Sequence, residues 1–364
     1  MTFEELRAQF PVLERIAYLN AGSMGPLMRA TGEAMIERTR RDVEDGRGGK
    51  PYFDEVLRLR AEVRSRIAAL LGVTEENVAL TASTTDSCNV VLAGFGLRPE
   101  DEVVTTDSEH PGLLLPLNVS GARVVVAPTT GRPSREALET ILSAVTPRTR
   151  LLALSHVAYT TGHVLPVHEL KAETGLPVLV DGAQSVGAIP VEAREIDFYT
   201  VSCQKWLCGP EPIGALYVRE PDALRIAAPS YFSQASMEKD GRFEPKPDAS
   251  RFDSGWVGVP ALAGLVAALD AAPDWRYERS AEAASRCRDA LAAAGFEVVT
   301  EPGHAALVSF VPHGDPAETV ARLYEEGVVI RDLPGTGWCR VSCGWWTSDG
   351  DIERLVAALA KAVD

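Results

Sequence analysis

A carboxylate and an amine follow two neighbouring apolar runs near the middle of the chain. Asp181 ends the run Val178–Val180, and Lys205 comes shortly after the run Phe198–Val201. Both runs are short, bounded by turn residues and rich in β-branched or aromatic side chains, which is typical of buried strands. A buried amine can act as a nucleophile or a base, and a carboxylate stabilises a cation beside it. Although a lone Asp or Lys is usually a surface charge, this placement predicts that Asp181 and Lys205 share one pocket.

A second polar group, the hydroxyls of Ser83, Thr84 and Thr85, lies between a predicted strand and a predicted helix. Backbone N–H groups at a helix start, joined by hydroxyls, can hold a phosphate without cationic side chains. A plain N-cap is the more common role of a single Ser or Thr. Gly94-Phe-Gly96 lacks the third glycine of a dinucleotide fingerprint, and no GxxxxGK occurs. The phosphate expected here is therefore not that of a nucleotide.

The run Asp181-Gly-Ala-Gln184, followed by Ser202-Cys-Gln-Lys205, resembles the core of the class V aminotransferase family. These are pyridoxal-phosphate (PLP) enzymes of fold type I, and they include cysteine desulfurases, cystine C–S lyases and isopenicillin-N-epimerase-like proteins. Such enzymes need a lysine for the Schiff base and an acid facing the pyridine nitrogen. The resemblance extends from about Tyr18 to Leu359 and implies that PLP is the cofactor.

The resemblance implies roles around the pyridine ring. Lys205 would form the internal aldimine and then act as the base at the substrate Cα, and Asp181 would pair with the protonated ring nitrogen. His110 would stack on one face of the ring and relay protons, with Ala183 packed on the other face. Gln184 would lie near the ring hydroxyl. The expected catalytic residues are thus Lys205, His110 and Asp181.

The remaining cofactor contacts depart from the usual family pattern at three positions. Thr84, Thr85 and Ser202 match phosphate-binding positions, but Gln204 stands where the family more often has His. Tyr159 replaces an Asn that contacts the region of the ring hydroxyl. Trp256 stands where a Gly-Thr pair usually reaches the phosphate of the partner subunit, and its indole N–H or the hydroxyl of Ser254 is the available substitute.

Substrate contacts are expected from both ends of the chain. Asn20 belongs to a Tyr-Leu-Asn-Ala segment that lies near the active site in the family. Arg340 matches the C-terminal arginine that grips the substrate α-carboxylate with a bidentate fork. Arg331, on the adjacent predicted strand, is a second candidate, for which a surface ion pair is an equally good interpretation.

The choice of reaction depends on the region before Arg340. Cysteine desulfurases that resemble this chain use a nucleophilic cysteine on a mobile loop, but Asp332–Trp338 contains none, and Cys339 alternates in direction with Arg340 along a strand. The leading hypothesis is a PLP-dependent C–S lyase that performs β-elimination on cysteine, cystine or an S-substituted cysteine. Cysteine desulfuration, epimerisation or transamination, and a non-catalytic binding or assembly role remain as alternatives.

Alternating strand and helix patterns from Val78 onward predict a mostly parallel sheet covered by helices on both faces. The resemblance makes this a seven-stranded fold type I sheet with a smaller C-terminal α+β domain. We expect residues 17–260 to form the large PLP-binding domain, and residues 1–16 and 261–364 to form the small one. A polar, exposed loop or an interface strand is expected at Met237–Asp253, and a flexible break at Arg47–Pro51.

Composition is that of a soluble globular protein: 364 residues, 46% hydrophobic and 24% charged. A net charge of −15 disfavours nucleic acid or an anionic membrane as a partner. No signal peptide or membrane-spanning run is evident, so we expect a cytoplasmic enzyme, and the resemblance implies a homodimer with active sites at its interface. The six cysteines form no CxxC pair and the six histidines show no recognised metal spacing, so no metal is expected.

Overall fold

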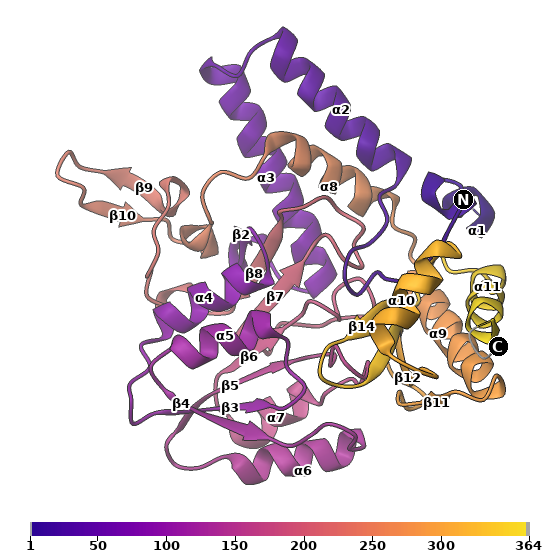
Figure 1. Cartoon of the computed structure of the whole chain (residues 1–364). Coiled ribbons are helices and arrows are strands. Elements are labelled where there is room, and N and C mark those ends of the chain that lie inside the picture. The colour runs from indigo at the N-terminus through magenta and orange to yellow at the C-terminus, as the bar shows by residue number, and fades with distance from the viewer. Residues whose placement is uncertain (1, 362–364) are drawn as a thin grey trace.

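The computed structural model describes residues 2–361 and is built around a seven-stranded sheet (Figure 1). The sheet has the order β2-β8-β7-β6-β5-β3-β4. Strands β4, β3, β5, β6 and β7 run parallel, whereas β8 is antiparallel to both β7 and β2. The prediction of a mostly parallel seven-stranded sheet is confirmed. The strands are β2 (Val78–Thr81), β3 (Glu102–Thr106), β4 (Arg123–Ala127), β5 (Thr149–Ser155), β6 (Val178–Asp181), β7 (Phe198–Ser202) and β8 (Gly214–Val218).

Helices cover both faces of this sheet, as its continuous apolar strands require. On one face, α3 (Gly49–Leu71), α6 (Ser134–Ala144), α7 (Val167–Thr174) and α8 (Val259–Ala271) share a core with residues of the strands. On the other face, α4 (Thr84–Phe95) and α5 (Pro111–Val119) form a separate core. Every residue of β2, β3, β6, β7 and β8 is buried between these layers.

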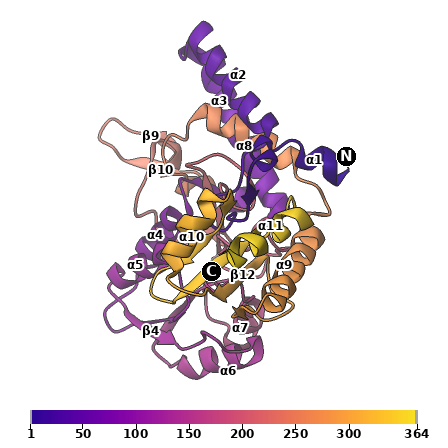
Figure 2. The same cartoon turned by 45° about the vertical axis from the view of Figure 1, so that its right-hand side comes forward.

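A smaller antiparallel sheet with the order β11-β12-β15-β14 lies beside the large one, and three helices accompany it (Figure 2). The chain start joins this unit, because β1 pairs in parallel with β13, and Ala17 and Leu19 lie in its core. Helix α2 (Arg29–Glu44) then leads back to the large sheet, packing against α8. The elements are β1 (Ala17–Tyr18), β11 (Glu297–Val298), β12 (Leu307–Val311), β13 (Val328–Val329), β14 (Arg331–Leu333), β15 (Trp338–Ser342), α9 (Arg276–Ala293), α10 (Pro316–Glu325) and α11 (Asp349–Ala360).

The division of the chain into two domains remains a proposal, and the packing favours boundaries other than 17 and 260. Strand β1 belongs by its pairing to the small unit, while α8 packs on α3 and the large sheet. We therefore propose that the large unit begins after the β1 segment and extends through α8 to about residue 272.

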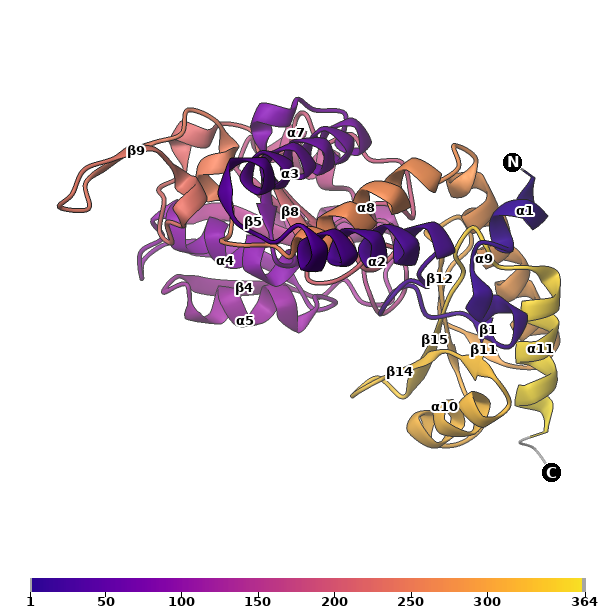
Figure 3. The ribbon, with the colours of Figure 1, turned by 90° about the horizontal axis from the view of Figure 1, so that it is seen from above.

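Local structure departs from the sequence prediction at two places. Helix α3 begins at Gly49, so the expected break at Arg47–Pro51 is shorter than predicted. Helix α5 was not predicted, although His110 and Pro111 are typical residues for a helix start. The exposed segment expected from Met237 belongs to a hairpin, β9 (Gln234–Met237) and β10 (Phe243–Pro245), which protrudes at the opposite end of the molecule from α10 and α11 (Figure 3).

Helix α3 ends at Gly72. Gly72 has φ 67°, the left-handed conformation that ends a helix and that glycine adopts without a steric penalty. Among residues 2–361, no helix is both long and apolar enough to cross a bilayer.

Candidate active site

Twelve of the fourteen residues predicted from the sequence line one cavity of about 350 Å³ at the carboxyl ends of β5, β6 and β7. Ligands bind at this edge in open α/β sheets because the connecting loops converge there. The predicted residues that line it are Thr84, Thr85, His110, Tyr159, Asp181, Ala183, Gln184, Ser202, Gln204, Lys205, Arg331 and Arg340. Ser83, which the sequence grouped with Thr84 and Thr85, also lines the cavity, and four further lining residues were not predicted: Gly22, Ser23, Met24 and Gly112.

Asp181, the last residue of β6, is buried in the floor of the cavity. Its Oδ1 accepts a hydrogen bond from the Ala183 N–H at 2.9 Å. Burial raises the pKa of this carboxyl, and the hydrogen bond from Ala183 and the charge of Lys205 oppose that rise. A cationic partner in the cavity would therefore stabilise Asp181 as the carboxylate.

Lys205 follows β7 in the turn that faces Asp181. Burial lowers the pKa of its amine to about 8, and the Asp181 carboxylate limits the fall. The Nζ atom has no hydrogen-bond or ion-pair partner among the described residues, so it is available to a ligand. Gly25 N–H donates to the Gln204 carbonyl at 2.7 Å, and a Cβ at Gly25 would lie 2.1 Å from the Lys205 carbonyl oxygen. Only glycine allows this close approach between the N-terminal segment and the lysine turn.

Hydroxyl and amide groups gather where α4 begins. Ser83 caps this helix by accepting from the Asp86 N–H, and the first helical amides have no partner within the helix. The Thr84 hydroxyl is buried without a hydrogen-bond partner among the described residues, and the Ser202 hydroxyl donates to Gln204 Oε1 at 3.0 Å. This is a donor-rich and neutral end of the cavity, suited to an anion.

His110 forms the N-cap of α5, and its ring is fixed from two sides. Its Nδ1 accepts from the Gly112 N–H at 2.9 Å, and Tyr159 meets the ring edge to face with centroids 5.1 Å apart. Burial, with the charges of Lys205, Arg331 and Arg340, lowers the pKa of His110 to about 4. The imidazole is therefore neutral at pH 7 and carries its proton on Nε2.

Gln184 connects the cavity floor to the N-terminal segment. Its Nε2 donates to the Gly22 carbonyl at 2.8 Å, and its Oε1 accepts from Trp206 Nε1 at 2.9 Å. One amide hydrogen remains for a ligand, so the position near a ring hydroxyl that was expected for Gln184 stays a prediction.

Two arginines form the opposite wall of the cavity. Arg340 is 1% exposed, donates to the Tyr159 carbonyl at 2.9 Å, and has a buried Nε without a partner. Neither Arg340 nor Arg331 forms an ion pair with a carboxylate in the part of the chain that the structure describes. Burial and the charge of Arg331 lower the pKa of Arg340. A ligand carboxylate at this wall would relieve the repulsion between the two charges.

Trp256 and Asn20 do not line the cavity. Trp256 is 58% exposed and lies in an aromatic cluster, stacked on Tyr231 with centroids 6.4 Å apart and meeting Phe53 and Phe232 at an angle. Asn20 forms a backbone bridge with Ser342, and its Oδ1 is buried without a partner. The Asn20 side chain therefore does not line the cavity, and the contact expected of Trp256, with the phosphate of the partner subunit, stays a prediction.

Ser254 contacts the α4 turn instead, through Asp86. Its hydroxyl donates to Asp86 Oδ2, an atom that also accepts from the Ala82 N–H. Ser254 therefore stabilises, through Asp86, the turn that carries the Ser83 and Thr84 hydroxyls.

Two buried residues next to the cavity complete its support. His156 Nδ1 lies 2.7 Å from the Tyr199 hydroxyl, which agrees with a structural role for that histidine. Glu109, which the sequence did not single out, accepts hydrogen bonds from the Ser155 N–H and hydroxyl and from the Thr106 hydroxyl. Burial raises the pKa of Glu109 to about 7.

All six cysteines are free and buried, and no thiol among the described residues lines the cavity. Cys339 points away from it, with its thiol directed at the Pro316 carbonyl at 3.6 Å. Burial raises the pKa of Cys339 to about 12, so this thiol is a poor nucleophile.

Comparison with known proteins decides the family. The profile described as "Aminotransferase class-V" matches residues 39–354. The chain belongs to the class V aminotransferase family. It is 32% identical to a cysteine desulfurase of Enterobacter sp. and 30% identical to an isopenicillin N epimerase of Amycolatopsis lactamdurans, in both cases over 98% of this chain and 97% of the relative.

Solved structures of this family superimpose closely on the chain. A C-DES mutant with glycine covalently linked to PLP gives a TM-score of 0.91 at 26% identity, covering 97% of this chain and 98% of that chain. The cystine C–S lyase C-DES in complex with cysteine persulfide gives 0.90 at 27% identity, covering 97% and 99%. The fold is therefore that of fold type I PLP enzymes.

PLP is the cofactor of this family, and the cavity fits it. The unpartnered Thr84 hydroxyl and the open amides of α4 suit the phosphate, the buried Asp181 suits a protonated ring nitrogen, and Lys205 offers a free amine. Among the described residues, the Thr84 hydroxyl and the Lys205 amine have no hydrogen-bond partner, and Asp181 accepts a hydrogen bond from the Ala183 N–H. All three groups can therefore bind the cofactor.

Proposed function

We propose that this enzyme is a PLP-dependent C–S lyase that eliminates a sulfur leaving group from Cβ of cystine, cysteine or an S-substituted cysteine. The observation that carries the proposal is the absence of a thiol among the described residues that line the cavity. Desulfuration requires an enzyme thiol to accept sulfur, whereas β-elimination requires none. The similarity to the cystine C–S lyase C-DES supports the same choice.

Each residue has a proposed task in holding the cofactor. Lys205 would hold PLP through Nζ, and Asp181 would keep the ring nitrogen protonated because a nearby carboxylate favours the cation. His110 and Ala183 would enclose the ring, and Gln184 and Tyr159 would approach its hydroxyl side. Thr84, Thr85, Ser202 and Gln204 would bind the phosphate. When bound, PLP withdraws electrons from the substrate Cα and thereby acidifies its proton.

The reaction then needs one base and one carboxylate-binding group. Lys205 Nζ would take the Cα proton, and a pKa of about 8 leaves part of the amine neutral near pH 7. Arg340, assisted by Arg331, would bind the α-carboxylate. Loss of the Cα–H and Cβ–S bonds and addition of one water convert cystine to cysteine persulfide, pyruvate and ammonia.

The decisive experiment compares substrates with purified holoenzyme. Cystine and S-methylcysteine should give pyruvate and a persulfide or thiol, whereas alanine, which lacks a leaving group, should give no pyruvate. Lys205→Ala should abolish pyruvate formation, while Lys50→Ala, an exposed lysine on α3, should behave like the parent. Alanine formed from cysteine, with sulfur retained on the protein, would instead establish desulfuration.

Two further outcomes separate the remaining candidates. Cys339→Ala should leave sulfur release unchanged, and its loss in that variant would restore the desulfurase hypothesis. Inversion of an amino acid at Cα without pyruvate would establish epimerisation, the activity named for one of the relatives.

We further propose that the enzyme is a cytoplasmic homodimer. Free thiols fit a reducing compartment. Tyr231, Met237, Phe243 and Trp256 are exposed on or beside the hairpin β9–β10, and such an apolar patch is typical of an interaction surface. Across a dimer interface, Trp256 or the hairpin would reach the cofactor site of the partner. Light scattering should give twice the mass of 39.1 kDa, and a monomer that is fully active would contradict this proposal.

A further inference from the structure

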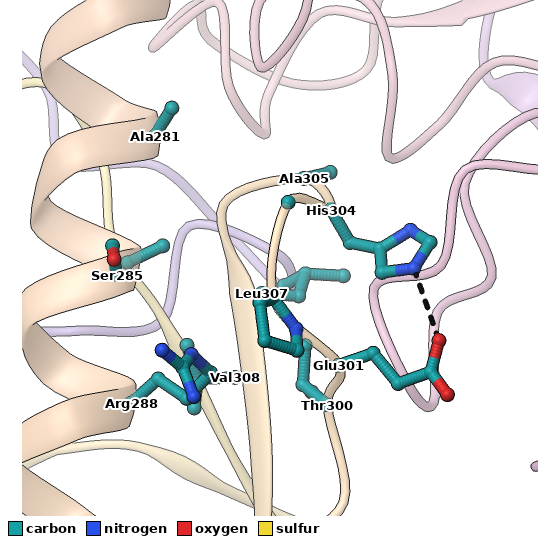
Figure 4. Close-up of a pocket in the computed structure, with 12 residues that line it drawn as sticks. Ala281, Ser285, Arg288, Thr300, Glu301, His304, Ala305, Leu307 and Val308 are labelled. Atoms are coloured by element: carbon teal, nitrogen blue, oxygen red, sulfur yellow. Dashed lines mark ion pairs between the residues drawn. The ribbon is translucent and has the colours of Figure 1, made fainter. Parts of the chain in front are cut away.

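A cluster of two imidazoles and a carboxylate lies outside the active site. His163 belongs to the turn after β5, and Glu301 and His304 belong to the loop between β11 and β12. One ligand atom of each residue lies within 4.8 Å of the other two. Figure 4 shows Glu301 and His304 pointing toward one another, with His304 Nε2 3.6 Å from Glu301 Oε2.

The cluster contains a buried polar atom that no residue of the described chain satisfies. His163 is 5% exposed, and its Nε2 is buried without a hydrogen-bond partner among the described residues. A buried polar atom without a partner is costly. The imidazole of His304 stacks on that of His163 with centroids 4.3 Å apart, and one ligand atom of each lies within 4.8 Å of the other. This arrangement leaves His163 Nε2 available to an ion.

We propose that His163, Glu301 and His304 bind a divalent transition-metal ion of the zinc type. Ions of this type bind well to imidazole nitrogens together with a carboxylate oxygen, whereas Mg²⁺ and Ca²⁺ prefer oxygen ligands. Three protein ligands leave one position for water. Glu301 and His304 also line a cavity of about 190 Å³ beside α9, which provides room for that water.

Binding requires a defined change at His304. Its Nδ1 accepts from the Val164 N–H at 3.1 Å, so without the ion the ring proton lies on Nε2. The ion would take Nε2, the proton would move to Nδ1, and the hydrogen bond from Val164 would be lost. Both imidazoles stay neutral and no proton is released. Small side-chain rotations would bring the donors to ~2.0–2.2 Å from the ion.

The ion would join the loop of Tyr159 to the small sheet. The Thr161 carbonyl already accepts from the Thr300 hydroxyl at 2.7 Å, and the Tyr159 carbonyl accepts from Arg340. A metal link at His163 would therefore hold the loop that positions the buried arginine. This role does not depend on which reaction the enzyme catalyses.

The test uses tag-free holoenzyme and Zn²⁺ alone, because an affinity tag would add histidines. Dialysis against dilute Zn²⁺ followed by elemental analysis should show one retained ion per chain, and calorimetry should give its affinity. Glu301→Gln and His304→Gln should each weaken binding by more than about 10-fold. Glu297→Gln, an exposed carboxylate on the neighbouring strand, is the matched control and should bind like the parent.

Co²⁺ provides a second measurement that does not depend on activity. Visible d–d absorption from Co²⁺ bound by nitrogen and oxygen should appear in the parent and in Glu297→Gln, and should be lost in His304→Gln. No retained Zn²⁺ in the parent, or equal binding by the parent and both ligand variants, would overturn the proposal. His163→Gln tests the buried ligand. If that variant does not fold, Glu301→Gln and His304→Gln, which change partly exposed side chains, decide the test.

Discussion

Arg331 and Arg340 occupy directly opposite positions on β14 and β15, and both donate to the Ser23 hydroxyl at 3.3 Å. Opposite residues of an antiparallel pair point to the same face, so the strand register alone brings the two charges together. The Ser23 hydroxyl accepts from both guanidinium groups, in the manner expected of a substrate carboxylate. If an amino acid binds here as proposed, its carboxylate would replace this neutral acceptor with a charged one.

Replacing Arg340 by lysine should weaken substrate binding more than it slows the chemical step. Lysine keeps the charge but loses the planar fork, and hydrogen bonds between charged groups contribute about 1.5–3 kcal/mol. We expect KM for cystine to rise about 10- to 100-fold in Arg340→Lys, with a smaller rise in Arg331→Lys. Steady-state kinetics would check this, with the exposed Arg135→Lys as the control. An unchanged KM in Arg340→Lys would exclude it as the carboxylate-binding residue.

Removing the Thr84 hydroxyl should weaken PLP binding without destabilising the protein. The hydroxyl is buried without a partner among the described residues, so valine removes an unsatisfied group while keeping the shape of the side chain. PLP titration of Thr84→Val should show a Kd about 10-fold higher than that of the parent. Thr31→Val is the matched control, because Thr31 also has a buried, unpartnered hydroxyl but lies in α2, away from the cavity. Equal Kd values for the parent and Thr84→Val would contradict the phosphate assignment.

Gly25→Ala should disturb the lysine turn. The added Cβ would lie 2.1 Å from the Lys205 carbonyl oxygen, and relieving such a contact costs about 1–3 kcal/mol of unfolding free energy. PLP absorbance and denaturant unfolding would measure both effects. Gly32→Ala, inside α2 with no atom within 4 Å of the new Cβ, should instead stabilise by about 0.5–1 kcal/mol. Normal PLP binding and stability in Gly25→Ala would show that the turn can move.

Glu109 should make stability depend on pH in a direction opposite to that of a surface carboxylate. Its pKa is raised in the folded state from 4.5 to about 7, so its contribution is fully present below pH 4.5 and is lost as pH rises through 7. The difference in unfolding free energy between the parent and Glu109→Gln should fall by about 3 kcal/mol over that interval and then stay constant.

Chemical denaturation of both proteins at a series of pH values would check this prediction. Taking the difference removes the opposing contributions of His110 and His156, whose pKa values are lowered to about 4. A difference that stays constant or grows with pH would show that Glu109 is ionised in the folded protein throughout.

Sequence reasoning located the cavity residues that lie at the ends of strands, because strand periodicity and turn residues are local signals. Asp181 and Lys205 are examples, and the parallel register places both at one edge of the sheet. Residues brought in by long-range packing were missed. Ser23 lines the cavity because it contacts the two arginines, and Gly112 lines it because it contacts the His110 ring.

The same limit applies to the two residues that lie outside the cavity. Trp256 packs with Phe53, Tyr231 and Phe232, and the contact expected of it, with the phosphate of the partner subunit, stays a prediction. Asn20 is held by backbone pairing to Ser342, a strand far away in sequence. The cluster at His163 shows no spacing signal, because its ligands come from two distant loops.

The contact of Ser23 with Arg340 also bears on how the enzyme is made. Ser23 lies near the start of the chain and Arg340 near its end, with the whole large sheet between them in sequence. The cofactor end of the cavity, from Thr84 to Lys205, also needs β8, which lies between β2 and β7 in the sheet, so during synthesis it can assemble once Val218 has emerged and before β15 is made. The two-arginine wall cannot form until β15 has emerged. A nascent chain is therefore expected to acquire the groups that hold PLP well before it acquires the groups that bind an amino acid.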